Sequence, residues 1–291
     1  KQEVIMTNSI YASEQSINEL VSAVNSLVKP LQQGKKEEYK QEKVLVLSDL
    51  HIPFHREDLI AEIVRENKDN LDLIVLSGDI LDCFNVSSFP KSMHIPLYEE
   101  LKIANKFLAD LDKATPNVKK VIFWGNHEYR FTRFLEKEAN EITPFFSTNI
   151  LDILKNGFEY RDFRNRKQKV DGLSDNFEVV DNWFYQHNDT IFAHPKNFSS
   201  VNMKTAANTY RYFVNAGYQF SAVCIGHTHK VGNIMIGRNL VTEVGCLCED
   251  MSYANNGNIN YTPQGLVYGI YYYDNGVVDI DNSGGRFLIG D

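Results

Sequence analysis

The sequence predicts an α/β fold, and three observations support this prediction. In the first half of the chain, short apolar segments typical of buried strands alternate with segments whose apolar residues recur at helical spacing. Five of the apolar segments end directly in aspartate, asparagine or histidine. The C-terminal part holds paired strand-like segments around turn residues. We therefore expect parallel strands joined by helical crossovers, then antiparallel or mixed strands, with polar side chains at one sheet edge.

The predicted main domain opens on the strand Val44–Leu47, whose apolar residues indicate burial on both faces. Asp49 and His51 follow it, so a rigid strand presents a carboxylate and an imidazole together. The next predicted elements are a helix over 57–66, a strand at Leu73–Ser77 before Gly78-Asp79, a helix over 97–112, and a strand at Val121–Trp124 before Gly125-Asn126-His127-Glu128.

The second half of the domain is predicted to become antiparallel or mixed. A helical region over 128–154 breaks near Pro144, and the polar segment 157–180 gives no clear element, with its arginines expected in a solvated loop. The later elements are a hairpin of 179–186 and 190–193 with an exposed His187 in its turn, a helix over 200–217 stopped by Gly217, a strand at Ala222–Ile225 before Gly226-His227-Thr228-His229, and hairpins of 231–236 with 240–244 and of 266–273 with 277–280.

Residues 1–42 differ from the rest and are predicted to be a helical extension and linker ahead of a domain over 43–291. A capping-box pattern at Ser16-Ile17-Asn18-Glu19 opens an amphipathic stripe that Pro30 ends, and a charged stretch follows it. The apolar stripe either packs on the main domain or mediates self-association or partner binding, and the sequence leaves both interpretations open.

Composition restricts the class of protein. The 291 residues are 43% hydrophobic, which is ordinary for a soluble protein, and the net charge of −8 argues against indiscriminate binding of long nucleic acid. No stretch approaches the ~18 apolar residues of a membrane span, and no signal-peptide pattern is present. The four cysteines are few and irregularly spaced, so we expect reduced thiols in a cytoplasmic protein and a packing role for Cys246 and Cys248.

The strand ends supply a set of nitrogen and oxygen ligands without cysteine. Such a set suits Mn²⁺, Fe²⁺ or Zn²⁺, and it is too large for one ion. A site for two ions ~3.5–4 Å apart, bridged by one carboxylate, is the economical interpretation. The candidate ligands are Asp49, His51, Asp79, Asn126, His194, His227 and His229.

In order along the chain, Asp49-x-His51, Gly78-Asp79-x-x-Asp82, Gly125-Asn126-His127-Glu128, His194 and Gly226-His227-x-His229 resemble the motif set of the calcineurin-like metallophosphoesterases. This resemblance implies a sandwich of two mixed β-sheets flanked by helices. It implies that Asp49, His51 and His229 bind one metal ion, that Asn126, His194 and His227 bind the other, and that Asp79 bridges them, with Mn²⁺ as the favoured metal. A metal-bridging hydroxide would be the nucleophile, with His127 as general acid oriented by Asp82.

Departures from the family pattern bear on the substrate. Cys83 and Trp124 stand where the protein-phosphatase branch carries arginines that grip a dianionic phosphate. This favours a phosphodiesterase acting on a nucleotide or nucleic-acid phosphodiester. A phosphomonoesterase of the same fold, for which Arg130 could supply the missing charge, and a catalytically silent scaffold are the alternatives.

Three further expectations concern single positions and a loop. His194 lies between Ala193 and Pro195 rather than after glycine, so its alignment is the weakest, with His187 as the only nearby replacement. Arg130 and Lys230 are the candidate substrate-binding cations. The polar segment 255–264 is a candidate flap over the site.

Overall fold

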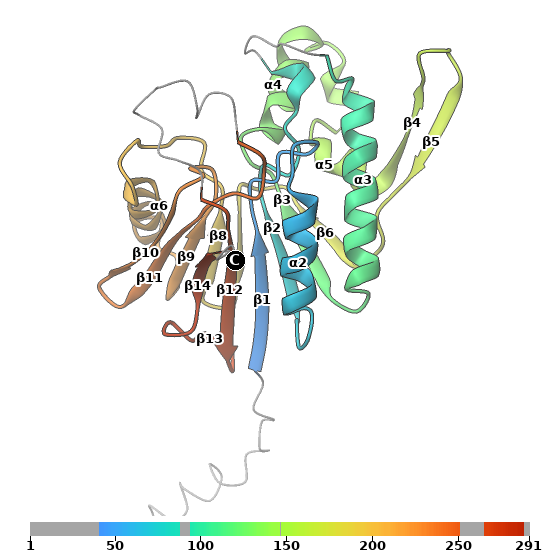
Figure 1. Ribbon diagram of the computed structural model, residues 1–291. Coiled ribbons are helices and arrows are strands. Elements are labelled where there is room, and N and C mark those ends of the chain that lie inside the picture. The colour runs from blue at the N-terminus through green and yellow to red at the C-terminus, as the bar shows by residue number, and fades with distance from the viewer. Residues whose placement is uncertain (1–40, 88–93, 146, 251–264, 288–291) are drawn as a thin grey trace, which may run out of the picture. The chain divides into compact units, whose positions relative to one another are not determined.

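The computed structural model describes residues 41–87, 94–145, 147–250 and 265–287 (Figure 1). The predicted N-terminal helix, its proposed self-association and the candidate flap at 255–264 lie outside these residues. The first strand begins at Gln41, so the last residues of the predicted linker already belong to the sheet.

The first of two large sheets has the strand order β13-β12-β1-β2-β3-β6, with β14 also paired to β12. Strands β1, β2, β3 and β6 run parallel, in registers such as Val44 opposite Leu73, and β12 runs antiparallel to β1. The strands of this sheet are β1 Gln41–Leu47, β2 Leu73–Ser77, β3 Lys119–Phe123, β6 Phe177–Val180, β12 Val267–Asp274, β13 Val277–Val278 and β14 Gly284–Phe287.

The second sheet has the order β10-β11-β9-β8-β7. Strands β8, β9 and β11 are parallel, whereas β7 and β10 pair antiparallel at the two edges. Its strands are β7 Phe184–His187, β8 Thr190–Ala193, β9 Ala222–Ile225, β10 Val231–Ile236 and β11 Asn239–Val244. The fold is therefore the predicted pair of mixed sheets.

Helices cover the outer face of each sheet (Figure 1). Those of the first half begin and end close to the predicted boundaries, and the region after β3 divides near Pro144 into two helices with a 3₁₀ turn between them. The helical segments are α2 Glu57–Asn67, η1 Phe84–Val86, α3 Leu97–Ala114, α4 Glu128–Glu138, η2 Thr143–Phe145, α5 Ile150–Asn156 and α6 Lys204–Asn215. Gly217, past the end of α6, has the left-handed φ of +83° that was predicted.

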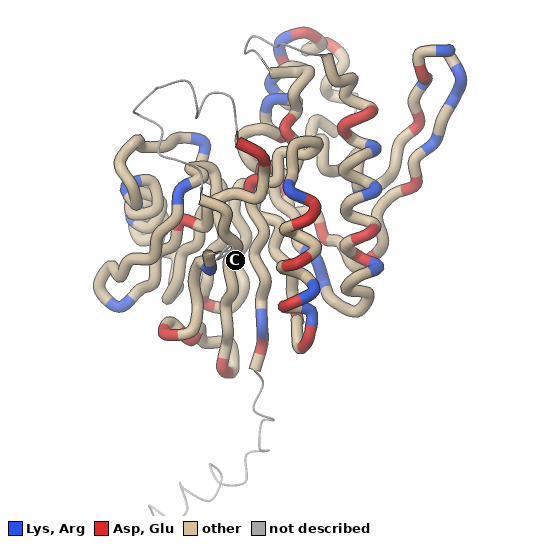
Figure 2. The backbone as a smooth tube through the Cα atoms, in the orientation of Figure 1, with Lys and Arg blue, Asp and Glu red and all other residues tan. Residues whose placement is uncertain are grey.

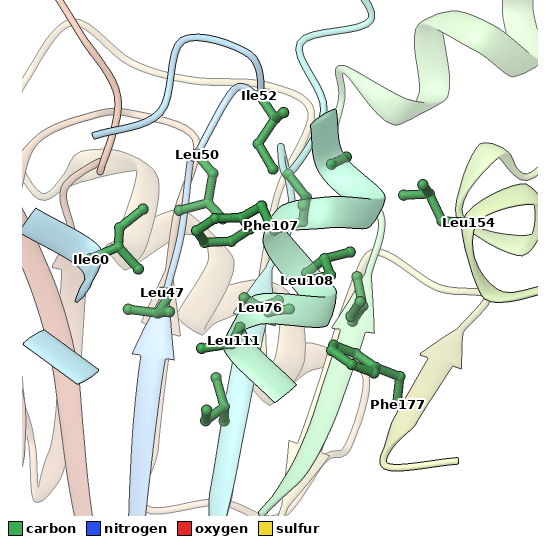
Figure 3. Packing of buried hydrophobic residues seen from close by; sticks show 14 of the residues in the cluster. Leu47, Leu50, Ile52, Ile60, Leu76, Phe107, Leu108, Leu111, Leu154 and Phe177 are labelled. Atoms are coloured by element: carbon green, nitrogen blue, oxygen red, sulfur yellow. The ribbon is translucent and has the colours of Figure 1, made fainter. Parts of the chain in front are cut away.

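Three buried apolar clusters hold these layers together. Alternate residues of β1 point to opposite faces, so Leu45 and Leu47 join α2 and α3 in one cluster while Val44 and Val46 pack between the two sheets. Figure 3 shows the first cluster, in which Phe107 and Leu108 of α3 lie over β1 and β2. The third cluster joins the second sheet to α6 through Phe213. Burial on both faces explains the uninterrupted apolar runs of the central strands.

The segment 157–180 was left without an element in the sequence prediction, and the structure corrects this. It forms the hairpin of β4 Gly157–Arg161 and β5 Lys167–Asp171, followed by the parallel edge strand β6. One face of the hairpin is half-buried and carries Phe158, Tyr160 and Val170, whereas the other face is exposed. These few apolar residues stand among charged and polar ones, so the alternation is too short to mark the hairpin in the sequence. Its arginines are exposed, as expected, and positive and negative residues are interleaved along it and along α2 and α3 (Figure 2).

The strand predicted over 179–186 is also two strands in different sheets. Strand β6, which pairs with β3, ends at Val180, and β7 starts at Phe184 in the other sheet. His187 is the last residue of β7 rather than an exposed turn residue. It is half-buried, and its Nε2 atom lies 3.0 Å from a carboxylate oxygen of Glu42.

The buried Glu100 of α3 makes the stability of this fold depend on pH. Its carboxylate accepts hydrogen bonds from the backbone N–H groups of Cys83 and Phe84. Burial raises the pKa of Glu100 from 4.5 to about 8, so the folded protein binds this proton more tightly than the unfolded chain. The group therefore stabilises the fold at low pH, and its contribution falls as the pH rises from 4.5 and is lost above about 8.

Glu100→Gln removes the charge but keeps only one acceptor for the two backbone N–H groups, which lowers stability by the same amount at every pH. We expect the free energy of unfolding of Glu100→Gln, taken relative to that of the natural chain, to be ~2–4 kcal/mol higher at about pH 9 than at about pH 5. Urea denaturation at several pH values measures this difference. Glu99→Gln, an exposed neighbour paired with Lys102, is the matched control. Parallel stability curves for Glu100→Gln and the natural chain would contradict the assignment.

Candidate metal centre

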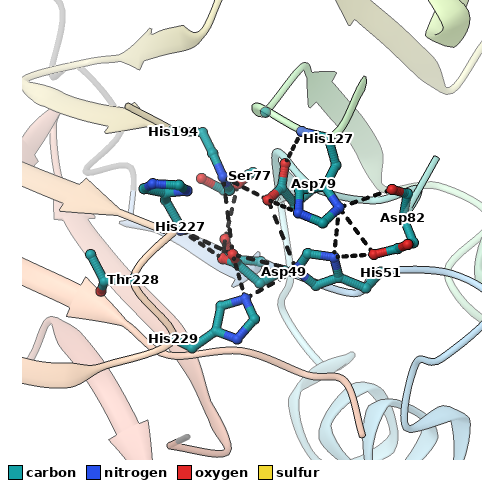
Figure 4. A network of polar contacts seen from close by, with 12 residues as sticks. Asp49, His51, Ser77, Asp79, Asp82, His127, His194, His227, Thr228 and His229 are labelled. Carbon is teal, nitrogen blue, oxygen red and sulfur yellow. Dashed lines mark hydrogen bonds and ion pairs between the residues drawn. The ribbon is translucent and has the colours of Figure 1, made fainter. Parts of the chain in front are cut away.

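Six of the seven predicted ligands converge on one edge of the two sheets, where the parallel strands β1, β2, β8 and β9 end, and the seventh, Asn126, follows β3 at the same edge (Figures 1 and 4). Five of them have left-handed backbones, with φ between 47° and 78°, which L residues adopt at a cost of ~1–3 kcal/mol each. This backbone conformation directs side chains that follow different strands toward one point. These five are Asp49, His51, Asp79, His227 and His229.

Two glycines allow the loops to approach this closely. A Cβ atom on Gly125 would lie 2.2 Å from Asp79 Oδ1, and one on Gly226 would lie 2.1 Å from Ser48 Oγ. Both contacts are far inside van der Waals distance. The glycines of the two motifs therefore serve the packing of neighbouring loops against the carboxylates.

The first group of side chains is Asp49, His51 and His229. The Nε2 atoms of the two histidines are 3.0 Å apart, and His229 Nε2 lies 3.2 Å from Asp49 Oδ1. The Nδ1 atom of His51 lies 3.1 Å from Asp82 Oδ1. Donation from this Nδ1–H leaves the Nε2 lone pair of His51 directed into the group, which is the tautomer that binds metal.

The second group is Asn126, His194 and His227. Here His194 Nδ1 donates to the carbonyl oxygen of Ser77 at 2.8 Å, which again leaves Nε2 as the lone-pair atom. The buried atoms Asn126 Oδ1 and His227 Nε2 make no hydrogen bond within the described part of the chain, whereas His194 Nε2 faces the carboxylate of Asp79. Two buried polar atoms thus lack the partner that buried polar groups ordinarily have.

Asp79 lies between the two groups. Its Oδ2 atom is 3.1 Å from His194 Nε2 and 3.9 Å from His51 Nε2, while Oδ1 accepts the backbone N–H of His127 at 2.8 Å. Ligand atoms of Asp79, His194 and His227 all lie within 4.8 Å of one another, and so do those of Asp49, His51 and Asp79. One carboxylate is thus shared by two potential metal-binding sets.

This donor set fits two divalent cations. The carboxylates and imidazoles are of the kind that Mn²⁺, Fe²⁺ and Zn²⁺ accept, and two imidazoles have the binding tautomer. The buried atoms Asn126 Oδ1 and His227 Nε2, which have no hydrogen-bond partner among the described residues, would gain a partner in a cation. When bound, such cations would supply charge neutralisation at the phosphoryl group and acidification of water.

The pKa shifts of the charged side chains in the cluster also indicate a cation-binding site. Burial disfavours ionised Asp49, but His194 and His229 lower its pKa to about 2. Burial alone would lower the pKa of His194, whereas Asp79 and Asp49 raise it to about 9. In His227 burial prevails and lowers the pKa to about 3. The buried carboxylates therefore attract positive charge, and divalent cations would meet this demand while the imidazoles remain neutral.

His127 and Asp82 lie beside the cluster as predicted. The Nδ1 atom of His127 lies 3.0 Å from Asp82 Oδ1 and 2.9 Å from its backbone oxygen, so it is the protonated nitrogen. The Nε2 atom of His127 accepts a hydrogen bond from Arg130 Nη2 at 2.7 Å. Arg130 also donates to the Asp82 carbonyl. The structure thus brings Arg130 to the site and holds His127 neutral.

Lys230 has a different role from the predicted one. Its ammonium group donates to the backbone oxygens of Ser199 and Ser200 at 2.9 and 2.7 Å, and the residue is 6% exposed. These bonds fix the loop after β8 rather than offer a cation to substrate. We therefore withdraw Lys230 from the substrate-binding candidates.

The structure also decides between two histidines. His194 reaches the cluster from the end of β8, and His187 lies at the other end of that hairpin beside Glu42. The unusual Ala193 and Pro195 neighbours do not displace His194, because its backbone N–H donates to Trp183 and fixes the strand end.

Two contributions were missed by the sequence analysis. The buried carboxylate of Glu128 accepts the backbone N–H groups of Asp79, Leu81 and Gly125 at 2.8–3.0 Å, and so ties the loop after β2 to the loop after β3. Cys248, expected only to pack, has its thiol within 4.8 Å of ligand atoms of His51 and His229. Both follow strand ends at this edge, which is the signal that could have identified them.

Comparison with known proteins gives one family match. The family described as calcineurin-like phosphoesterase matches residues 42–231, more than half of the chain. No curated protein sequence matches significantly. Among the described residues, no helix combines the length and apolar character needed to cross a bilayer.

The solved structures that match this chain are distant from it. They include a "predicted phosphoesterase" from Streptococcus pneumoniae TIGR4 (12% identity, 85% of this chain and 98% of that chain, TM-score 0.33), an archaeal phosphodiesterase (14%, 81% and 99%, 0.36) and vacuolar protein sorting 29 from Cryptosporidium parvum (14%, 85% and 98%, 0.36). At such identities and scores, these likenesses carry no argument about substrate.

Proposed function

Since the chain belongs to the calcineurin-like phosphoesterases, a family of hydrolases that act on phosphate esters, we propose that it is a dinuclear metal-dependent phosphodiesterase acting on a nucleotide or nucleic-acid phosphodiester. The observation that carries this proposal is the convergence of two ligand groups on Asp79, with two buried ligand atoms, Asn126 Oδ1 and His227 Nε2, left without hydrogen bonds in the described residues. Asp49, His51 and His229 would hold one cation, and Asn126, His194 and His227 the other. Mn²⁺ is the cation we would supply first.

The residues around the cluster support separate roles in phosphate binding and proton transfer. The scissile phosphate would lie against the cluster, where Arg130 can turn from His127 toward a phosphoryl oxygen. That movement frees Nε2 of His127, which can then take up a proton from solvent and pass it to the leaving oxygen, while Asp82 accepts the Nδ1–H on the other side of the ring. Asp82 also fixes the tautomer of His51, so one carboxylate orients both a ligand and the acid.

Preference for a diester is supported by the residues that replace two arginines of the protein-phosphatase branch. Cys83 is fully buried, and Trp124 lines a cavity rather than the cluster. A diester phosphate carries one negative charge, which needs fewer cationic side chains than a monoester dianion does. The four cysteines are buried as thiols, which also supports a reducing compartment such as the cytoplasm.

The test compares hydrolysis of bis(p-nitrophenyl) phosphate with that of p-nitrophenyl phosphate by Mn²⁺-loaded protein. We expect the larger kcat/KM for the diester. The alternative, a phosphomonoesterase, is favoured by one specific observation, the guanidinium of Arg130 beside His127. A larger kcat/KM for the monoester, reduced by Arg130→Lys, would establish that alternative and reject the diesterase.

A further inference from the structure

A cavity of about 560 Å³ adjoins the second ligand group. Trp124 lies two residues before Asn126, and Pro195 follows His194 directly. The ring of Phe198 meets that of His227 edge-on, with centroids 5.7 Å apart. The cavity therefore opens between the end of β3, the loop after β8 and helix α6, next to the place where a scissile phosphate would bind.

Four aromatic residues, Trp124, Trp183, Phe198 and Tyr212, line this cavity. Trp183 stacks on Phe213 at 5.3 Å with an interplanar angle of 19°, which fixes its ring, and Tyr212 meets Trp183 edge-on at 5.4 Å. Phe198 and Tyr212 are nevertheless 50% and 53% exposed. Rings held beside a catalytic cluster but left open to solvent offer stacking surfaces to a planar ligand, worth ~1–3 kcal/mol per base.

Polar groups complete the lining. Asn208 on α6 and Asn197 in the loop offer amide groups of the kind that pair with the edges of a base. The ammonium of Lys196 lies 5.1 Å from the ring centroid of Trp124 and places a positive charge in the wall. The two hydrogen bonds from Lys230 to the loop after β8 hold this wall in place. The volume falls within the ~300–1,000 Å³ usual for small-molecule sites.

We propose that this cavity binds the base and sugar of a nucleotide whose phosphate reaches the metal cluster. The assignment rests on the proposed phosphodiesterase function and narrows its substrate to an ester with a nucleoside beside the scissile phosphate. Phe198 and Tyr212 are the specificity-determining side chains, because they are the exposed rings of the lining.

The chain provides its own reporter for binding, since its only two tryptophans, Trp124 and Trp183, both line the cavity. We expect thymidine 5′-monophosphate to quench tryptophan fluorescence saturably, and ribose 5-phosphate, which lacks a base, to have little effect. Phe198→Ala and Tyr212→Ala should each weaken the nucleotide titration at least ~10-fold. Phe163→Ala, which removes an 82% exposed ring from the β4–β5 turn, is the matched control and should leave it unchanged.

A kinetic arm separates this inference from the proposed function. Thymidine 5′-(p-nitrophenyl phosphate) should exceed methyl p-nitrophenyl phosphate in kcat/KM by at least ~10-fold, and Phe198→Ala should remove most of that advantage. Turnover of both esters with no preference for the nucleoside, and equal quenching by the two phosphates, would overturn the inference and leave the diesterase intact. Base-dependent quenching without turnover of any diester would support the nucleotide cavity and reject the proposed reaction.

Discussion

Replacing Asp79 by asparagine is expected to lower metal-dependent hydrolysis of bis(p-nitrophenyl) phosphate by at least ~10³-fold. Asp79 is the carboxylate shared by both ligand groups, so the substitution weakens both proposed metal sites at once. The amide oxygen of asparagine can still accept the backbone N–H of His127, so the loop after β3 should stay in place. Initial rates over a range of Mn²⁺ concentrations measure the loss.

A thermal melt distinguishes this loss from unfolding. Excess Mn²⁺ should raise the melting temperature of the natural chain, because a ligand bound only by the folded state stabilises it, and should raise that of Asp79→Asn much less. Asp175→Asn, a fully exposed carboxylate near β6, is the matched control for both assays. Activity within ~10-fold of the natural chain in Asp79→Asn would be inconsistent with a bridging carboxylate.

The second large effect is expected for His127→Asn, and it depends on the leaving group. For a dinucleotide, whose leaving group is an alkoxide, we expect kcat to fall by ~10²–10⁴-fold, the usual worth of general-acid catalysis. For a p-nitrophenyl diester the loss should be below ~10-fold, because p-nitrophenolate leaves without a proton. Paired kinetics on the two substrates measure the difference.

His187→Asn is the matched control for this substitution, since His187 lies on β7 away from the cluster and pairs with Glu42. Equal losses on both substrates would show that His127 acts by positioning Asp79 or Arg130 rather than by delivering a proton. That outcome would contradict the role of His127 as general acid and would leave the proposed metal centre unaffected.

Much of the fold was predictable because its central strands are buried on both faces. Continuous apolar runs such as Val44–Leu47 and Leu73–Ser77 mark the positions of these strands in the sequence. The polar residues that follow them lie at one edge of the sheet because parallel strands end on the same side. The ligand cluster was predictable for the same reason, since a parallel sheet brings together what its strand ends carry. His194 joined the cluster although its neighbours depart from the family motif.

The remainder depended on contacts that a sequence does not display. The strands β4 and β5 have no fully buried residue, and the short edge strand β6 is followed within a few residues by a strand of the other sheet. Lys230 looked available for substrate because its backbone acceptors lie thirty residues away in sequence. Glu128 bonds to loops that meet only once both strands are in one sheet.

The central claim, that this sheet edge holds two metal ions, is tested most directly by counting them. Metal-stripped protein titrated with Mn²⁺ in a calorimeter, with bound metal checked by elemental analysis, should take up two equivalents. His229→Ala and His227→Ala, one from each ligand group, should each lose one site and keep the other, because only Asp79 is common to both. Uptake of a single equivalent by the natural chain, unchanged in either variant, would contradict the dinuclear assignment.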